Sequence, residues 1–167
     1  MTASRRLAAR LLGGCLLAAV LAGCATPQRA PAQPGVQVYT GRLALAVSAN
    51  PPQAFSAGFE LKGAPEAGEL TLYSPLGGTL AVLGWTPGSA SLKSGHEVRQ
   101  FASLDALASE VTGTELPVAA LFDWLGGKAT AVAGWQADVS EVANGRLRAQ
   151  RTTPAPAADL RIAFDNK

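Results

Sequence analysis

The sequence predicts an α+β protein in which one antiparallel sheet curls around two helices. Three observations predict this class. Apolar and polar residues alternate through much of residues 36–101, the pattern turns helical between residues 103 and 127, and alternation returns between residues 135 and 165. Chains that order strands, helices and strands in this way bury one face of an antiparallel sheet against the helices. The length suits one domain with one core.

The expected strands are period-two segments separated by turn residues. Asn50-Pro51-Pro52, Ser94-Gly95 and Asn144-Gly145 are the clearest turns, and Asn-Gly strongly favours a hairpin. The run Leu80 to Trp85 is apolar on both faces, which predicts a strand that is buried twice or lines an apolar cavity. The expected strands are residues 42–47, 55–62, 69–73, 79–85, 89–93, 97–100, 135–141, 146–152 and 160–165.

Two helices are expected in the middle of the chain. Ser103 is a good N-cap for a helix with apolar residues at i, i+3, i+4 and i+7 from Leu104, which Gly113 can close. A second helix is expected to start at Pro117 and to end at Gly126-Gly127. Because Asp123 is its only charged residue, this helix should be covered on several sides and could plug the open end of a curved sheet.

The N-terminus has the pattern of a lipoprotein signal peptide. A basic start is followed by an apolar run from Leu11 to Leu21 that is too short for a comfortable membrane span. Leu21-Ala22-Gly23-Cys24 is similar to the lipobox of bacterial lipoproteins, whose cysteine is acylated after cleavage. We therefore expect a signal peptide at residues 1–23, an acylated N-terminus and flexible Pro/Ala-rich tether at 24–35, and a domain at 36–167. The alternative is an ordinary secreted protein with an incidental cysteine.

Composition gives little support for nucleic-acid binding or catalysis. Removing the signal leaves 11 basic against 12 acidic residues, so no electrostatic case for a nucleic-acid partner remains. His96 is the only histidine, both cysteines lie at or before the acylation position, and the carboxylates are scattered. We therefore expect no metal, no cofactor and no enzymatic activity.

The turn between Tyr73 and Thr79 carries an unusual residue. Pro75, Gly77 and Gly78 are typical turn residues, but Leu76 places a large apolar side chain at the tip. Leu76 could fold back on a neighbouring strand or simply be exposed, as single leucines often are. It could also act as a hydrophobic finger that contacts a membrane or a lipid.

The ordered motifs of the chain resemble the family of the outer-membrane lipoprotein receptor LolB. The resemblance rests on the lipobox and on motifs in order through the mature chain: Thr40-Gly41-Arg42-Leu43-Ala44, Phe55 to Phe59, Leu72-Tyr73-Ser74-Pro75-Leu76-Gly77, Gly113, Leu116-Pro117-Val118, Leu121, Trp124-Leu125-Gly126 and Gly134-Trp135. The chain departs from the family where Lys128-Ala129 replace a usual proline and where a C-terminal tryptophan is absent.

This resemblance implies an open, incomplete antiparallel β-barrel with a helical lid and an apolar cavity. It implies a monomer, held by its acyl chains on the periplasmic face of the outer membrane, that takes acylated lipoproteins from the carrier LolA and inserts them into the outer-membrane lipid. The membrane-insertion loop then maps onto Pro75, Leu76 and Gly77. The candidate acyl-cavity residues are Phe55, Phe59, Leu72, Leu80, Val82, Trp85, Leu121, Trp124 and Leu125.

Two other functions stay open at this point. One is a structural outer-membrane lipoprotein that binds another protein through its sheet edge, and this function predicts no lipid uptake. The other is an enzyme on the same scaffold, which would need a clustered polar site that the sequence does not indicate.

Overall fold

The computed structural model describes residues 36–112 and 116–165. The expected signal peptide, Cys24, the tether and the helix-closing Gly113 lie outside these residues. The described residues form one nine-stranded sheet, two α-helices and one 3₁₀-helix. The elements are β1 Gln37–Val47, β2 Gln53–Gly63, β3 Gly68–Tyr73, β4 Thr79–Thr86, β5 Ser89–Ser94, β6 Glu97–Phe101, α2 Leu104–Thr112, α3 Val118–Leu125, β7 Trp135–Asp138, η2 Val142–Asn144, β8 Arg146–Arg151 and β9 Ala158–Phe164.

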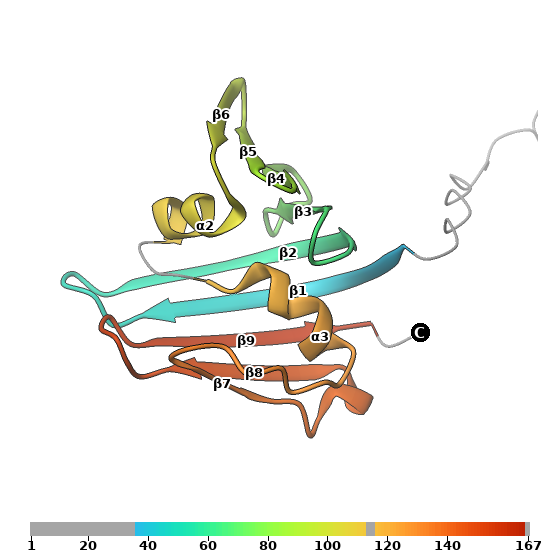
Figure 1. Cartoon of the computed structure of the whole chain (residues 1–167), viewed down its shortest axis with the longest axis vertical. Helices are drawn as coiled ribbons and strands as arrows, with labels where there is room; N and C mark the ends of the chain where they lie inside the picture. Colours follow the sequence, from blue (N-terminus) through green and yellow to red (C-terminus); the bar gives the residue numbers. More distant parts are fainter. Residues whose placement is uncertain (1–35, 113–115, 166–167) are drawn as a thin grey trace, which may run out of the picture. The chain divides into compact units, whose positions relative to one another are not determined.

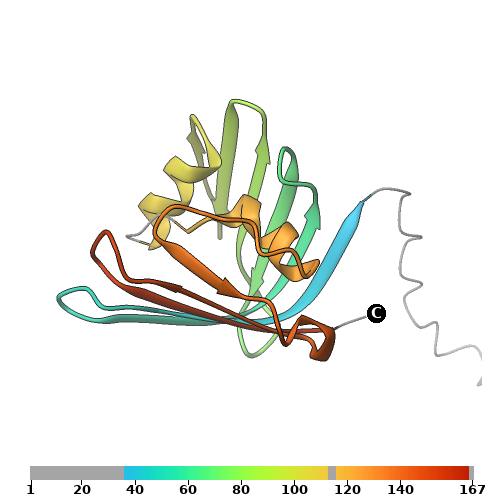
Figure 2. The same cartoon turned by 60° about the horizontal axis from the view of Figure 1, so that its bottom comes forward.

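The sheet is antiparallel throughout and open. Its strand order is β6-β5-β4-β3-β2-β1-β9-β8-β7, so β6 and β7 form the two edges. Strand β1 lies in the interior of the sheet, pairing with β2 along its whole length and with β9 from Gly41 to Val47. The end of the chain therefore returns to its first strand. Figures 1 and 2 show the sheet curving around α2 and α3, which confirms the α+β class.

The core follows from the alternation along the strands. In β1, Leu43, Leu45 and Val47 are buried on the inner face, whereas the residues between them are exposed on the outer face. Helix α3 contributes five buried side chains to the same core. Its Phe122 packs edge-on against Trp85 of β4, with ring centroids 6.2 Å apart. Among the described residues, the buried apolar side chains run from Leu43 to Phe164 and form one core cluster.

Helix α2 begins where the sequence predicts, and α3 begins one residue later than expected, with Pro117 as its N-cap. The Ala106 N–H donates to Ser103 Oγ at 3.1 Å, which confirms Ser103 as the N-cap of α2. Helix α3 begins at Val118, directly after Pro117, and ends at Leu125 before the two glycines. The expected strand at 135–141 was too long. Strand β7 stops at Asp138, because the Asp138 carboxylate accepts hydrogen bonds from both the N–H and the hydroxyl of Ser140 and turns the chain.

Candidate functional site

An apolar pocket of about 320 Å³ lies between the inner face of the sheet and the two helices. Its walls come from β1, β2, β3, β4 and β9 on one side, and from α2, α3 and Leu116 on the other. All the lining residues except Gln53 are apolar. They are Leu43, Leu45, Val47, Gln53, Ala54, Phe55, Leu70, Leu72, Leu83, Ala108, Val111, Leu116, Val118 and Leu160.

Two large apolar side chains of this pocket remain exposed to solvent. Phe55, near the start of β2, is 40% exposed, and Val111, in the last turn of α2, is 44% exposed. The other lining residues of β1 and β9 are buried. Phe55 and Val111 therefore mark the mouth, and an apolar ligand that enters there would cover both side chains.

Only two of the nine candidate cavity residues line this pocket, namely Phe55 and Leu72. Five others are buried in the core without contributing to the pocket wall: Phe59, Trp85, Leu121, Trp124 and Leu125. The remaining two, Leu80 and Val82, lie on the opposite face of β4 from the buried Leu83 and Trp85.

The pairing of β3 with β4 is irregular beside Leu80. Leu72 of β3 pairs with Ala81, but the next residue, Tyr73, pairs with Thr79. Leu80 therefore has no partner in β3, and its side chain is 39% exposed. The second apolar face of β4 is consequently not fully buried, contrary to the expectation of a strand covered on both sides.

Most residues of the pocket wall lie outside the set of nine predicted cavity residues. Leu43, Leu45 and Val47 were recognised as one face of a strand, and this period-two pattern was the available signal. Leu160 lines the same pocket from β9, about 115 residues further along the chain, because β9 pairs with β1. No local pattern reveals that pairing.

The turn that carries Leu76 is tight and well defined. Gly77 N–H donates to Ser74 O at 2.9 Å, and Ser74 N–H donates to Gly78 O at 2.8 Å. Gly77 has a φ of 85°, in the left-handed region that glycine tolerates. Pro75, Leu76 and Gly77 are thus the three residues of a hairpin loop, and the Leu76 side chain is 97% exposed. The option in which Leu76 folds back onto a strand does not occur.

The C-terminal end of α3 is held by a small polar network. Trp124 Nε1–H donates to the backbone oxygen of Thr130 at 2.9 Å, and the Thr130 hydroxyl donates to the Asp123 carboxylate. The Thr130 hydrogen bond, with a smaller contribution from Lys128, lowers the pKa of the Asp123 carboxyl. The ring of Trp124 also packs against Trp135 of β7, with centroids 6.4 Å apart. These contacts fix α3 against the sheet beside the pocket.

The described residues hold no cluster of three metal-ligating side chains. His96 is exposed in the turn between β5 and β6. None of the helices described here is both long and apolar enough to cross a membrane.

An open antiparallel sheet with an apolar pocket beneath two helices defines a class of domain suited to apolar ligands. Comparison with known proteins gives the family. The family model for "Outer membrane lipoprotein LolB" matches residues 37–164, and the chain belongs to this family.

Several curated relatives carry the name Outer-membrane lipoprotein LolB. The Bordetella petrii protein is 33% identical to this chain, over 88% of the chain and 87% of the relative. The Cupriavidus metallidurans protein is 37% identical over 87% of the chain and 72% of the relative. The Cupriavidus taiwanensis protein is 35% identical over 95% of the chain and 85% of the relative.

Proposed function

We propose that this protein is an outer-membrane lipoprotein that receives acylated lipoproteins from the periplasmic carrier LolA and inserts them into the outer membrane. The observation that carries this proposal is the apolar pocket with an exposed mouth at Phe55 and Val111. In this proposal the open sheet acts as an incomplete β-barrel, and α2 and α3 act as its lid. The acyl part of the cargo enters the pocket.

The physical chemistry of the pocket suits an acyl chain. Each CH₂ group removed from water stabilises the complex by about 0.8 kcal/mol. No charged side chain of the described residues lines the pocket, so no charged group would lose its hydration when an acyl chain binds there. Transfer from the carrier then needs no nucleotide, because each step requires only a favourable free-energy difference between two apolar sites and finally the bilayer.

The exposed turn provides the contact with the destination membrane. Leu76 would gain about 1.5–3 kcal/mol on entering an apolar phase. That free energy biases docking at a bilayer but is too small to anchor a domain. We assign the anchoring to acylation of Cys24, with residues 1–23 as the cleaved signal, 24–35 as the tether, and the domain 36–167 monomeric at the periplasmic face. No catalytic step is assigned to the domain.

Cargo transfer in solution tests the proposal. The chain from residue 36 onward, which contains this core cluster, is mixed with LolA carrying an acylated lipoprotein, and pull-down shows which protein then holds the cargo. Transfer of the cargo to this chain would support the proposed receptor function. Retention by LolA, with a domain that is folded by circular dichroism, would contradict it and favour a structural outer-membrane lipoprotein that binds proteins through its sheet edge.

A further inference from the structure

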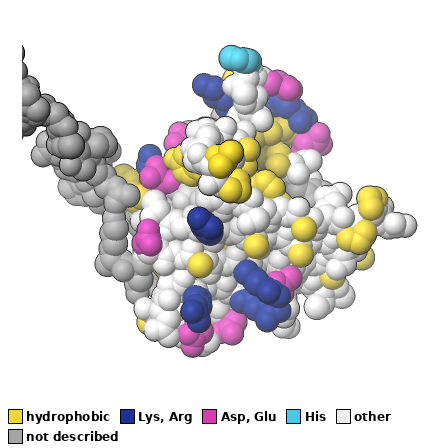
Figure 3. All heavy atoms as spheres, turned by 180° about the vertical axis from the view of Figure 1, so that it is seen from behind, with side chains coloured by type: hydrophobic (Ala, Val, Ile, Leu, Met, Phe, Trp, Pro, Cys, Tyr) yellow, Lys and Arg dark blue, Asp and Glu magenta, His cyan; other side chains and the backbone are white. Residues whose placement is uncertain are grey.

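A second surface of the domain, separate from the apolar pocket and the Leu76 turn, carries several charged side chains. It lies on the outer face of β8, β9 and β1, away from α3, where the charged residues lining a shallow groove are the basic Arg42, Arg146, Arg148 and Arg161 and the acidic Asp138 and Glu141. We call the four arginines the arginine face. Figure 3 views the molecule from behind and shows basic side chains gathered over the lower part of this side.

The register places two of these arginines in one row of the sheet. Arg146 of β8 pairs with Ala163 of β9, which pairs with Arg42 of β1. Residues directly opposite in neighbouring strands share a face, so the two arginines stand two strand spacings, or about 10 Å, apart. The small Ala163 between them leaves space above the sheet where an anion could lie.

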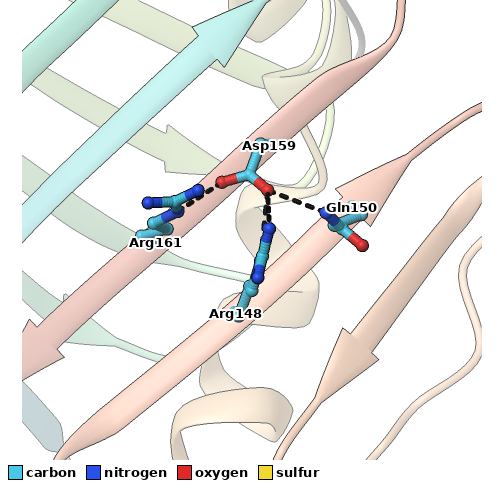
Figure 4. Close-up of polar contacts among 4 residues, drawn as sticks. All are labelled: Arg148, Gln150, Asp159 and Arg161. Carbon is cyan, nitrogen blue, oxygen red and sulfur yellow. Dashed lines mark hydrogen bonds and ion pairs between the residues drawn. The ribbon is translucent and has the colours of Figure 1, made fainter.

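The nearby carboxylates already have partners. Asp159 accepts hydrogen bonds from Arg148, Gln150 and Arg161, at 2.7–3.1 Å (Figure 4). The other four are also held locally: Asp138 by Ser140, Glu141 by Asn144, Glu60 by Lys62 and Asp165 by Thr40. Arg42 and Arg146 form no ion pair or side-chain hydrogen bond with the described residues. Their guanidinium groups remain available for an external anion.

The same row leads to the Leu76 turn. Arg42 pairs with Gly58 of β2, and Gly58 pairs with Tyr73 of β3, the last residue of the strand before the turn. Tyr73 packs close to Gly58, where an added Cβ would lie 3.4 Å from the Tyr73 Cβ. Figure 2 shows the β3–β4 turn projecting from the side of the sheet opposite the helices, which is the side of the arginine face.

We propose that Arg42 and Arg146 bind the phosphates of anionic phospholipids and dock the outer face of the sheet on the bilayer that Leu76 enters. Guanidinium groups bind phosphate oxygens in a bidentate manner, and tyrosine side chains favour the membrane interface. Because the arginines and the apolar tip lie on one side of the domain, together they would set the orientation of the domain on the bilayer as well as its affinity for the bilayer. This inference rests on the proposed function, because it describes how the same delivery step engages its membrane.

Vesicle binding of the chain from residue 36 onward tests the proposal. The probe is an equimolar mixture of phosphatidylcholine and phosphatidylglycerol, with pure phosphatidylcholine for comparison. A basic residue near an anionic surface contributes about five-fold in affinity, so Arg42→Gln with Arg146→Gln should weaken binding to the mixed vesicles about 25-fold. The loss should shrink at high salt and should be small on pure phosphatidylcholine. Arg42→Lys with Arg146→Lys keeps both charges but loses the bidentate geometry, so its affinity should lie between those of the wild type and the glutamine variant.

The matched control removes two charges elsewhere. Lys93 of β5 and Arg99 of β6 are exposed, and β5 and β6 lie at the other side of the sheet from β8. Changing both to glutamine removes the same charge and should leave most of the binding intact. Wild-type affinity of the Arg42/Arg146 variant for the mixed vesicles, or an equal loss in the control pair, would overturn the proposal.

Cargo uptake from LolA without vesicles separates this proposal from the receptor function. Uptake should be the same in the Arg42/Arg146 variant as in the wild type. Loss of uptake in that variant would overturn membrane docking and assign the arginine face to the carrier. A wild-type domain that takes no cargo would contradict the receptor function, while the vesicle measurement would still decide the role of the arginines.

Discussion

Ser74 and Gly78 close the Leu76 turn through two hydrogen bonds. Ser74 N–H donates to the Gly78 carbonyl at 2.8 Å, and Gly78 N–H donates to Ser74 Oγ at 3.1 Å. A three-residue loop closed on both sides has little freedom to withdraw its tip. The turn therefore presents Leu76 to solvent as a fixed feature of the fold, without depending on packing of the leucine itself.

Leu76→Glu should leave the fold and cargo uptake unchanged but impair delivery to the membrane. The side chain is 97% exposed, so the free energy of unfolding should change by less than about 0.5 kcal/mol. Loss of about 1.5–3 kcal/mol of apolar burial should lower vesicle affinity by roughly 10- to 100-fold. Vesicle sedimentation and transfer of cargo to vesicles measure the effect. Val98→Glu, at an exposed position of β6, is the control, and normal delivery by Leu76→Glu would refute the role of the tip.

Gly77→Ala should destabilise the domain by about 1 kcal/mol, since a side chain at a φ of 85° is strained even though the space around it is open. Gly78→Ala is the matched control. Gly78 lacks a positive φ, and its added Cβ would make an ordinary contact of 3.5 Å with Ser74 Oγ. Urea denaturation measures both variants, and equal stabilities would contradict this account of the turn.

Phe55→Ser should weaken binding of a fluorescent fatty acid by roughly 30-fold. Phe55 lines the pocket and is 40% exposed, so a bound chain would cover about 80 Å² of its ring surface, or about 2 kcal/mol. Leu80→Ser is the control, because Leu80 is 39% exposed but lies outside the pocket lining. Equal losses in the two variants would show that the fatty acid does not enter through this mouth.

Asp159→Asn should lower the free energy of unfolding by about 1 kcal/mol at neutral pH. Partial burial alone would raise the pKa of Asp159, but hydrogen bonds from Arg148, Gln150 and Arg161 outweigh it and hold the pKa below the ordinary 3.8. A lowered pKa in the folded state means that the carboxylate stabilises the fold above pH 3.8 and that this contribution is lost as the pH falls through the folded pKa.

The difference in free energy of unfolding between the wild type and Asp159→Asn should therefore become smaller at acidic pH. Denaturation across a pH series measures it. Glu66→Gln, which removes a carboxylate from an exposed turn, is the control variant. A gap between Asp159→Asn and wild type that stays constant below pH 3.8 would contradict the assignment of the pKa shift to Asp159.

Local sequence patterns predicted the elements more accurately than the candidate site. Period-two alternation placed Leu43, Leu45 and Val47 on one face, and capping placed the start of α2 at Ser103, because both effects act between near neighbours in the chain. The end of β7 was missed because the Asp138–Ser140 hydrogen bonds compete with strand pairing in a way that alternation does not reveal.

The sequence by itself determined the α+β class, the order of the elements, and a turn with Leu76 at its tip, since proline, glycine and apolar periodicity act locally. Tertiary structure alone decided which apolar residues line the pocket. Phe55 and Leu80 are both large, apolar and similarly exposed, yet only Phe55 lines the pocket, because Leu80 lies on the face of β4 opposite the buried Leu83 and Trp85. The return of β9 to β1 likewise brought Leu160 to the pocket wall, because strand pairing joins residues far apart in the chain.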